Sequence, residues 1–406
     1  MTTLQSPPPG LTRDPAWHEP EAVLARTRTL AAELAAGAAG TERARTVAPE
    51  TVERLREAGL FSLTLPRVLG GSETDPHTVL SVIEEVSAAD PSVGWALMIG
   101  QSSGFLGWAD VSTGRQVVDV TPDPVIACAL APMGVGAVLP AEQVGDAGEP
   151  VYRLQGKWSI NSGCRHADWF IAAFAMKQDG EDSPSWGEDF VRFAVLPADR
   201  VQVLDTWRVM GLRGSGSDDV VIADVDVPHS MTFSPFFEAA EHEGPLYKLS
   251  YFAFLMMMMG GFSSGLARRA IEEVSALAQE GAAVRIADPD THVELWRHDN
   301  DRLAARLLLH DAAEAVWQEV RRDGAASAVT RARFAGAVQL SQRTAERVVD
   351  FAYRAAGPAA LRAEHPLQRC WRDIHAAGAH IAFSLTAERR MARVVYEGDR
   401  SMQYMI

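Results

Sequence analysis

The stretch GLRGSGS at residues 211–217 stands just before a strand-like run, 220–227, in the middle third of the chain. Its three glycines permit close backbone approach and positive φ angles, and its hydroxyls and amides suit phosphate or polyol oxygens. It has neither the Gly-Lys-Ser/Thr of a P-loop nor the spacing GxGxxG. Such a loop alone is weak evidence for a ligand, so its surroundings decide how it is interpreted.

Short strand-like runs surround this loop. They are rich in β-branched and aromatic residues, and Gly, Pro and Asp separate them. Since βαβ units would need intervening helices, the spacing predicts a compact antiparallel sandwich or barrel. The runs are 125–130, 152–160, 169–176, 190–196, 201–204 and 220–227.

Helical patterns fill the rest of the chain. Four segments precede the strands (20–40, 49–58, 76–89 and 91–100), and four long amphipathic ones follow them (262–279, 295–322, 332–355 and 367–396). The latter predict a four-helix bundle, and the expected class is α+β, mainly α. The expected units are a flexible N-terminus (1–19), an N-terminal helical domain (20–122), a middle β domain (123–235) and a C-terminal four-helix bundle domain (236–406).

The composition argues against several classes of protein. Hydrophobic residues make up 47% of the 406 and charged residues 22%, as in ordinary globular proteins. The net charge of −15 argues against a nucleic-acid or anionic-membrane partner. No signal peptide is evident and the longest apolar run, 252–259, is too short to span a bilayer, so we expect a cytoplasmic location. Three cysteines without a CxxC pair, and no HExxH, predict no metal site.

A second motif, WSINSGCRHADW at 158–169, lies between two of the strand-like runs. The Ser162 hydroxyl and the loop amides around it suit the polar edge of a flavin, namely its N5, O4 and N3 positions. A turn at the end of a strand, with His166 and Asp168 pairing locally, explains the same residues equally well. The motif alone leaves both interpretations open.

Three further patterns are weighed against simpler explanations. GFSSG at 261–265 fits GxSxG, but it lies in a helix-rich stretch without the strand or the oxyanion loop of a serine hydrolase. The methionines at 256–259 are typical of a core, or of an adaptable substrate pocket. His375 and His380 are five positions apart and so do not share a helix face, which argues against their chelating one ion.

The order of helical, β and helical segments, together with 211–217 and the strand after it, resembles the acyl-CoA dehydrogenase fold. GKWSINSGCRHADW at 156–169 and PLQRCWRDIHAAGAH at 366–380 are more similar to the two-component (group D) flavin-dependent monooxygenases of that superfamily. The resemblance covers about residues 20–395. It implies a homotetrameric oxygenase that receives reduced FMN or FAD from a separate flavin reductase. The lack of a clear adenine-binding pattern favours reduced FMN, FMNH2.

The C-terminal motif separates two chemistries within this superfamily. Common acyl-CoA dehydrogenases place a catalytic Glu shortly after an Arg-Asp pair, as the base that removes the α-proton. Here Arg372-Asp373 is followed by AHIA at 379–382, and Glu388 lies two helical turns beyond. The resemblance therefore implies a monooxygenase that uses O2, through a C4a-(hydro)peroxyflavin, to oxygenate a small cyclic or aromatic substrate. A flavin dehydrogenase with a displaced base, and a non-catalytic binding scaffold, stay open as alternatives.

The resemblance also implies roles for individual residues. His380 would hydrogen-bond the peroxide or draw off a phenolic proton, with an interhelical or capping histidine as the alternative. Ser162 would contact flavin N5, and His375 would lie at the flavin edge. The expected cofactor-binding residues are Trp158, Asn161, Ser162, Gly163, Arg213, Ser215, Ser217 and Arg285, and the expected substrate-pocket residues are Trp95, Gln101, Ser103, Met256 and Met257.

Two positions depart from the pattern of the branch. Many of its members carry a His in the loop after DPSVGW, which is present here at 90–95, but this loop reads GQSSG at 100–104. Gln101 or a Ser would have to replace that group, so a heteroatom or a non-phenolic carbon remains open as the target. The usual Arg-x-x-Phe-Gly against the flavin phosphate is reduced to RIAD at 285–288, and a surface salt bridge explains Arg285 nearly as well.

Overall fold

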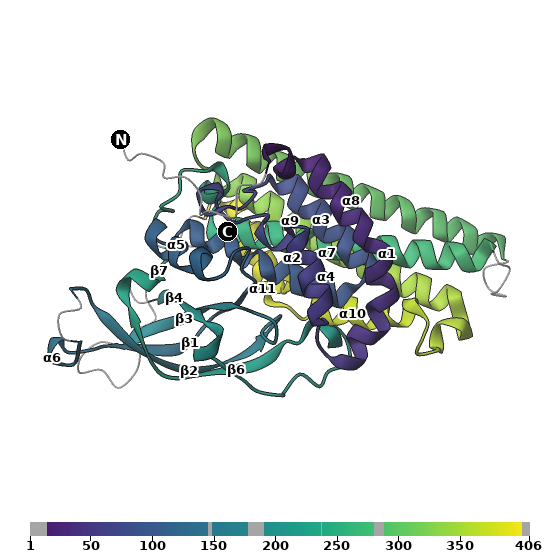
Figure 1. Ribbon diagram of the computed structural model, residues 1–406. Coiled ribbons are helices and arrows are strands. Elements are labelled where there is room, and N and C mark those ends of the chain that lie inside the picture. Colours follow the sequence, from purple (N-terminus) through teal and green to yellow (C-terminus); the bar gives the residue numbers. More distant parts are fainter. Residues whose placement is uncertain (1–13, 145–147, 178–190, 237, 280–287, 400–406) are drawn as a thin grey trace.

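Helices from both ends of the chain pack together on one side of a single sheet (Figure 1). The computed structural model describes residues 14–144, 148–177, 191–236, 238–279 and 288–399. The order of helices, strands and helices confirms the expected α+β, mainly α, class. Within those described ranges, no helix is long and apolar enough to cross a membrane.

The first four helices each begin at a proline, whose missing N–H costs nothing at this position. Asp75 and Asp90 cap α3 and α4, each through a side-chain oxygen that accepts an amide of the first turn. A further helix, at 111–120, was not predicted. The helices are α1 (Pro20–Ala44), α2 (Pro49–Glu57), α3 (Pro76–Ala89), α4 (Pro91–Gly100) and α5 (Val111–Val120), with 3-10 turns at Pro15–His18, Leu60–Ser62, Arg67–Leu69 and Gln101–Gly107.

Within the described residues, the strands form one seven-stranded sheet in the order β5-β6-β2-β1-β3-β4-β7. The structure differs from the antiparallel prediction in one pairing, because β1 and β3 are parallel. The loop after β2 carries the chain across to the other edge of β1, and β3 therefore runs in the same direction as β1. The strands are β1 (Ile126–Val138), β2 (Val151–Asn161), β3 (Trp169–Lys177), β4 (Val191–Pro197), β5 (Gln202–Val203), β6 (Asp218–Pro228) and β7 (Thr232–Phe233), with the short α6 (Ala141–Val144) after β1.

In the part of the C-terminal region that the structure describes, there are five α-helices rather than four. The expected helix 367–396 is interrupted by a 3-10 turn, Ile381–Phe383, on whose two sides His380 and Ser384 act as N-caps. These caps end one helix and begin the next, since each offers a side-chain acceptor to free amides. The helices are α7 (Tyr251–Gln279), α8 (Pro289–Asp323), α9 (Ala328–Ala356), α10 (Pro366–Gly378) and α11 (Leu385–Glu397).

Helix α7 lies at the centre of the helical layer and packs against α3 and α9. Its glycines bring the backbones close: a Cβ on Gly261 would stand 2.2 Å from the carbonyl oxygen of Leu80, and one on Gly265 would stand 2.5 Å from that of Glu84. Ser263 donates to Gln342 Oε1 over 2.6 Å. The GxSxG pattern is therefore explained by close helix packing.

Candidate active site

Two loops that the sequence singled out meet beside the sheet. Strands β2 and β6 are antiparallel, with Asn161 paired to Asp218, so the loop after β2 lies next to the loop before β6. The amide of Gly163 donates to the carbonyl of Ser215 over 3.0 Å. Gly163 has a φ of +76°, which an L side chain rarely adopts. The sheet register thus joins motifs that are about fifty residues apart.

Hydroxyl groups from both loops form a continuous chain of hydrogen bonds. Trp95 Nε1, on α4, donates to Ser162 Oγ over 2.9 Å. Ser162 Oγ lies 2.7 Å from Ser217 Oγ, which lies 2.7 Å from Ser215 Oγ. Ser215 Oγ in turn donates to the carbonyl of Leu212 over 2.7 Å. The structure therefore brings together four of the residues that the sequence proposed for cofactor or substrate.

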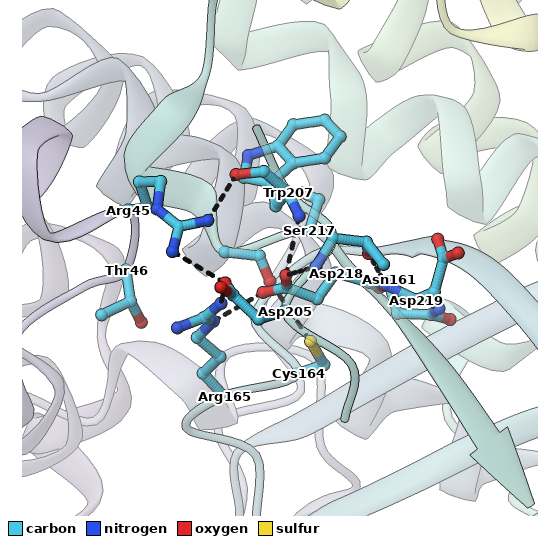
Figure 2. A network of polar contacts seen from close by, with 12 residues as sticks. Arg45, Thr46, Asn161, Cys164, Arg165, Asp205, Trp207, Ser217, Asp218 and Asp219 are labelled. Atoms are coloured by element: carbon cyan, nitrogen blue, oxygen red, sulfur yellow. Dashed lines mark hydrogen bonds and ion pairs between the residues drawn. The ribbon is translucent and has the colours of Figure 1, made fainter. Parts of the chain in front are cut away.

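A polar clamp, formed by Arg45, Arg165, Asp205 and Asp218, holds the two loops together (Figure 2). Arg165 Nε donates to Asp218 Oδ2 over 2.5 Å and its Nη2 to Asp205 Oδ1 over 2.7 Å. Arg45, at the end of α1, donates to the same Asp205 oxygen.

Asp218 is the centre of the clamp, and its side chain has no exposed surface. Its Oδ1 accepts the amides of Thr206 and Trp207, each over 2.8 Å. Burial alone would raise the pKa of Asp218, but Arg165 and these two amides hold that pKa below its usual value. Sequence reasoning did not assign Arg165 or Asp218 a role. The signal was present, since an Arg inside one motif and an Asp just after the other are complementary.

A carboxylate and a hydroxyl on the helices support the 211–217 loop from the other side. Asp373, on α10, accepts the amide of Leu212 over 2.5 Å, and Ser92 Oγ accepts that of Gly214 over 3.1 Å. Leu212 adopts a φ of +53°, which is unfavourable for a residue with a side chain and needs such support. Burial raises the pKa of Asp373 to about 7.

His380 lies beside the start of the hydroxyl chain. Its ring centroid is 6.0 Å from that of Trp95, in an edge-to-face arrangement. Its Nδ1 accepts the amide of Ala382 over 3.2 Å, so the capping interpretation is correct for this nitrogen. The residue as a whole is exposed, whereas desolvation of its ring lowers the pKa of His380 to about 4. The neutral ring then carries its proton on Nε2, because Nδ1 is an acceptor.

His375 does not join this group. Its Nε2 lies 3.0 Å from Asp350 Oδ1, and its ring packs edge-on against Trp371. Two positions on a helix differ by about 200°, so His375 and Asp373 point to nearly opposite sides of α10. His375 therefore belongs to the contact between α10 and α9.

Several other predicted residues are part of the interior. Trp158 is 1% exposed, and its Nε1 donates to the carbonyl of Ala173 inside the sheet. Gln101 and Ser103 are fully buried and donate to backbone carbonyls of 60–61 and 97. Met256 and Met257 are fully buried in α7. Among these residues, Gln101 also has a buried Oε1 without a partner in the described part of the chain. The roles expected for these five residues stay predictions.

The residues that remain fit a flat, polar-edged ligand such as a flavin. Arg213 Nε is buried and has no hydrogen-bond partner among the described residues, which suits an incoming anionic or carbonyl group. Asn161 donates from Nδ2 to the carbonyls of Trp158 and Asp218, while its buried Oδ1 also lacks a partner there. Arg285 lies outside the described residues. Within the same part of the chain no group of three or more His, Cys, Asp or Glu residues could hold a metal ion.

Comparisons with known proteins point to one family. The model "Acyl-CoA dehydrogenase, N-terminal domain" matches residues 18–114, and "Acyl-CoA dehydrogenase, C-terminal domain" matches 257–385. The flavin-dependent monooxygenase oxygenase subunit HsaA of Rhodococcus jostii is 30% identical over 84% of this chain and 89% of its own. The FADH2-dependent resorcinol hydroxylase, oxygenase component, of a Rhizobium species is 28% identical over 86% and 87%. The crystal structure of 3-HSA hydroxylase from Rhodococcus sp. RHA1 superposes with a TM-score of 0.85 at 26% identity, covering 95% of this chain and 99% of that one.

Proposed function

Because the chain belongs to the flavin-dependent monooxygenases of the acyl-CoA dehydrogenase fold, where it is an oxygenase component, we propose that it works with a separate flavin reductase. It receives reduced FMN or FAD and uses O2 to oxygenate a small cyclic or aromatic molecule. The names "oxygenase subunit" and "oxygenase component" of its relatives support a second protein. The relative from Rhizobium is named for FADH2, so both flavins need testing.

The observation that carries this proposal is that Ser162 and His380 both contact Trp95. Trp95 donates to Ser162, and His380 lies edge-on to the same indole. A hydroxyl and a neutral imidazole thus meet at Trp95, and His380 stands near the sequence position where the resemblance places the carboxylate base of a dehydrogenase. The two nearest carboxylates in the sequence are engaged elsewhere: Asp373 accepts the amide of Leu212, and Glu388 forms an ion pair with Arg343.

Each residue of the proposed site has a task that its chemistry allows. When bound, the reduced flavin would supply the two electrons that O2 needs to act as an oxygenating agent. Ser162 would lie at N5 of the flavin. Its position would be held by the neighbouring loop residues Ser215, Ser217, Asn161 and Gly163. Arg213 would bind an anionic or carbonyl edge of the flavin. His380 would donate its Nε2 proton toward the bound oxygen. This is the first of the two roles expected for His380. The second, as a base for a phenolic proton, is less suitable because Nε2 already carries a proton and Nδ1 accepts an amide.

An assembly of four subunits also remains part of the proposal. Helix α8 presents large apolar side chains to solvent, with Trp296 and Leu307 each 67% exposed and Leu303 and Leu308 over 40% exposed. Trp296, Leu303 and Leu307 recur on one side of the helix, at spacings of seven and four, as in a helix that packs on another. Burying them against a second copy would remove them from water.

The first test mixes the anaerobic protein and reduced flavin with O2 and follows the flavin absorbance. We expect oxidation to pass through a transient species and to be slower than that of free reduced flavin. Direct oxidation at the rate of the free flavin would contradict the monooxygenase mechanism. A protein that instead holds oxidised flavin tightly, and is bleached by substrate without O2, would be a dehydrogenase.

A further inference from the structure

The hydroxyl chain between Trp95 and Leu212 has a direction, which its two ends determine. An indole N–H can only donate, and a backbone carbonyl can only accept. Ser215 Oγ lies 2.7 Å from the carbonyl oxygen of Leu212, so the single proton of Ser215 must point there. The opposite orientation would bring lone pairs of two oxygens face to face at that distance.

The proton positions of the other serine hydroxyls follow in turn. Since the proton of Ser215 is used, Ser217 must donate to Ser215 across 2.7 Å. Since the proton of Ser217 is then used, Ser162 must donate to Ser217, also across 2.7 Å. Trp95 Nε1 completes the series by donating to Ser162. Each serine therefore gives one proton and receives one, always toward Leu212.

The acceptor at the end of the chain is held firmly. The Leu212 carbonyl also accepts Trp207 Nε1 over 2.9 Å and the amide of Ser215 over 3.1 Å. Its own amide is bound by Asp373, which is 2% exposed. The positive φ of Leu212 is thus stabilised on both sides, and the carbonyl cannot turn away without losing these bonds.

The direction of the hydroxyl chain determines what Ser162 can offer to a ligand. Ser162 is 5% exposed, and the proposed function places it at the flavin. Its proton is committed to Ser217, and one of its two lone pairs accepts from Trp95. What it can offer to a ligand is one remaining lone pair, so it is an acceptor. A flavin presents a donor at N5 only when reduced, since N5 then carries a proton, and it presents a lone pair when oxidised.

We propose that the one-way chain from Trp95 through Ser162, Ser217 and Ser215 makes the site select reduced flavin over oxidised flavin. Ser217 and Ser215 are positioning residues in this scheme, because they act on the ligand through Ser162. The inference rests on the proposed function, in which Ser162 lies at N5. Such selection suits a protein that takes up reduced flavin and must release it oxidised.

Equilibrium binding of both redox states of FMN and FAD tests the inference without any turnover. Reduced flavin is titrated anaerobically and oxidised flavin in air, and the ratio of the two dissociation constants is compared. We expect the native protein to bind reduced flavin about tenfold or more tightly, as for one mismatched buried hydrogen bond. Each tenfold preference raises the midpoint potential of the bound flavin by about 30 mV, which provides an independent readout.

Ser217→Ala releases the proton of Ser162, which can then turn to N5 of oxidised flavin. We expect oxidised flavin to bind more tightly and the ratio to fall toward one. Ser215→Ala is the second variant, and it should lower the ratio part of the way, because Ser217 is no longer obliged to donate away from Ser162. Ser234→Ala is the matched control: Ser234 is also buried, but donates to the carbonyl of Val191, and its variant should keep the native ratio.

The outcomes separate the inference from the proposed function. Equal binding of the two redox states by the native protein overturns the inference and leaves flavin binding intact. A native ratio that survives in both Ser217→Ala and Ser215→Ala overturns it as well. If neither redox state binds to a folded native protein, the proposed function fails, and the inference fails with it.

Discussion

Arg165 binds Asp218 through an Nε–Oδ2 contact of 2.5 Å and thereby ties the loop after β2 to the first residue of β6. The pair is the centre of the clamp shown in Figure 2. Ser162 and Ser217 precede these two residues closely in the sequence, so the clamp determines how far apart their hydroxyls lie.

Asp218→Asn should loosen the clamp and weaken both the fold and the coupling of oxygen to product. The Arg165 cation would lose its buried partner, and we expect a loss on the order of 2 kcal/mol in the free energy of unfolding by urea. We also expect more H2O2 per turnover. Asp226→Asn is the control, because Asp226 lies on the same strand and pairs with Arg153 at the surface. That change should cost less than about 1 kcal/mol and leave coupling unaltered; equal effects of both would rule out a special role for the clamp.

Changing His380 separates its capping role from its proposed role as a donor. His380→Ala should lower product formation strongly, leave flavin affinity within a few-fold, and cost about 1 kcal/mol of stability through the lost cap. His380→Asn should restore the cap, because the Asn side chain accepts an amide well, but it should not restore product formation. Steady-state product yield and thermal unfolding measure the two effects. Recovery of product in the Asn variant would mean that His380 is only a cap.

The buried Asp373 should make stability depend on pH. Burial raises its pKa to about 7 in the folded chain, against an ordinary value of 3.8. Between these values the folded chain holds a proton that the unfolded chain has lost, so stability is highest at low pH and declines as pH rises through about 7. From pH 6 to 8 the loss should be on the order of 1 kcal/mol.

Asp373→Asn should flatten this part of the curve, since the amide cannot ionise while its oxygen can still accept the amide of Leu212. Thermal unfolding of the native protein and the variant, compared at pH 6, 7 and 8, would measure the difference. Burial also raises the pKa of Asp90, to about 6, so Asp90 lowers stability with rising pH in the native protein and in the Asp373→Asn variant alike. This shared contribution serves as an internal reference. Parallel curves for the two proteins would contradict the assignment.

Two glycine substitutions test the packing of α7. Gly261→Ala should destabilise the chain by several kcal/mol, because the added carbon would stand 2.2 Å from the Leu80 carbonyl oxygen and the helices would have to separate. Gly336→Ala, in the middle of α9 with nothing within 4 Å of the added carbon, should stabilise it by about 0.5–1 kcal/mol. Urea unfolding of both variants gives the comparison. A mild effect of the first substitution would show that α3 and α7 can adjust.

The class and most elements could be predicted from the sequence because local patterns carry them. Helices that start at Pro20, Pro49, Pro76 and Pro91 are signalled by the proline itself. The parallel pairing of β1 and β3 could not be predicted, because it depends on where the loop after β2 crosses the sheet. The break at 381–383 was missed because the apolar pattern continues through it, whereas two side-chain caps stop the helix.

The site was only partly predictable for a related reason. Ser162, Ser215 and Ser217 stand in recognisable Gly/Ser loops, and the structure brings them within hydrogen-bonding distance. Trp158 carries the same local signal, but strand alternation turns its ring into the sheet interior. Arg165 and Asp218 lie in or next to the two recognisable motifs, but they act only as a pair across more than fifty residues, so neither residue alone indicates the contact.

The turn that interrupts the last helices links acid–base chemistry to local folding. His380 starts this turn by accepting an amide on Nδ1, and a proton on that nitrogen would replace an acceptor with a donor. Protonation of the ring therefore removes this side-chain cap. Acidification through the pKa of His380, about 4, would weaken the start of the turn by about 1 kcal/mol, while the backbone hydrogen bonds of 380–384 remain. At neutral pH the same linkage keeps the imidazole uncharged and its free N–H aimed in one direction.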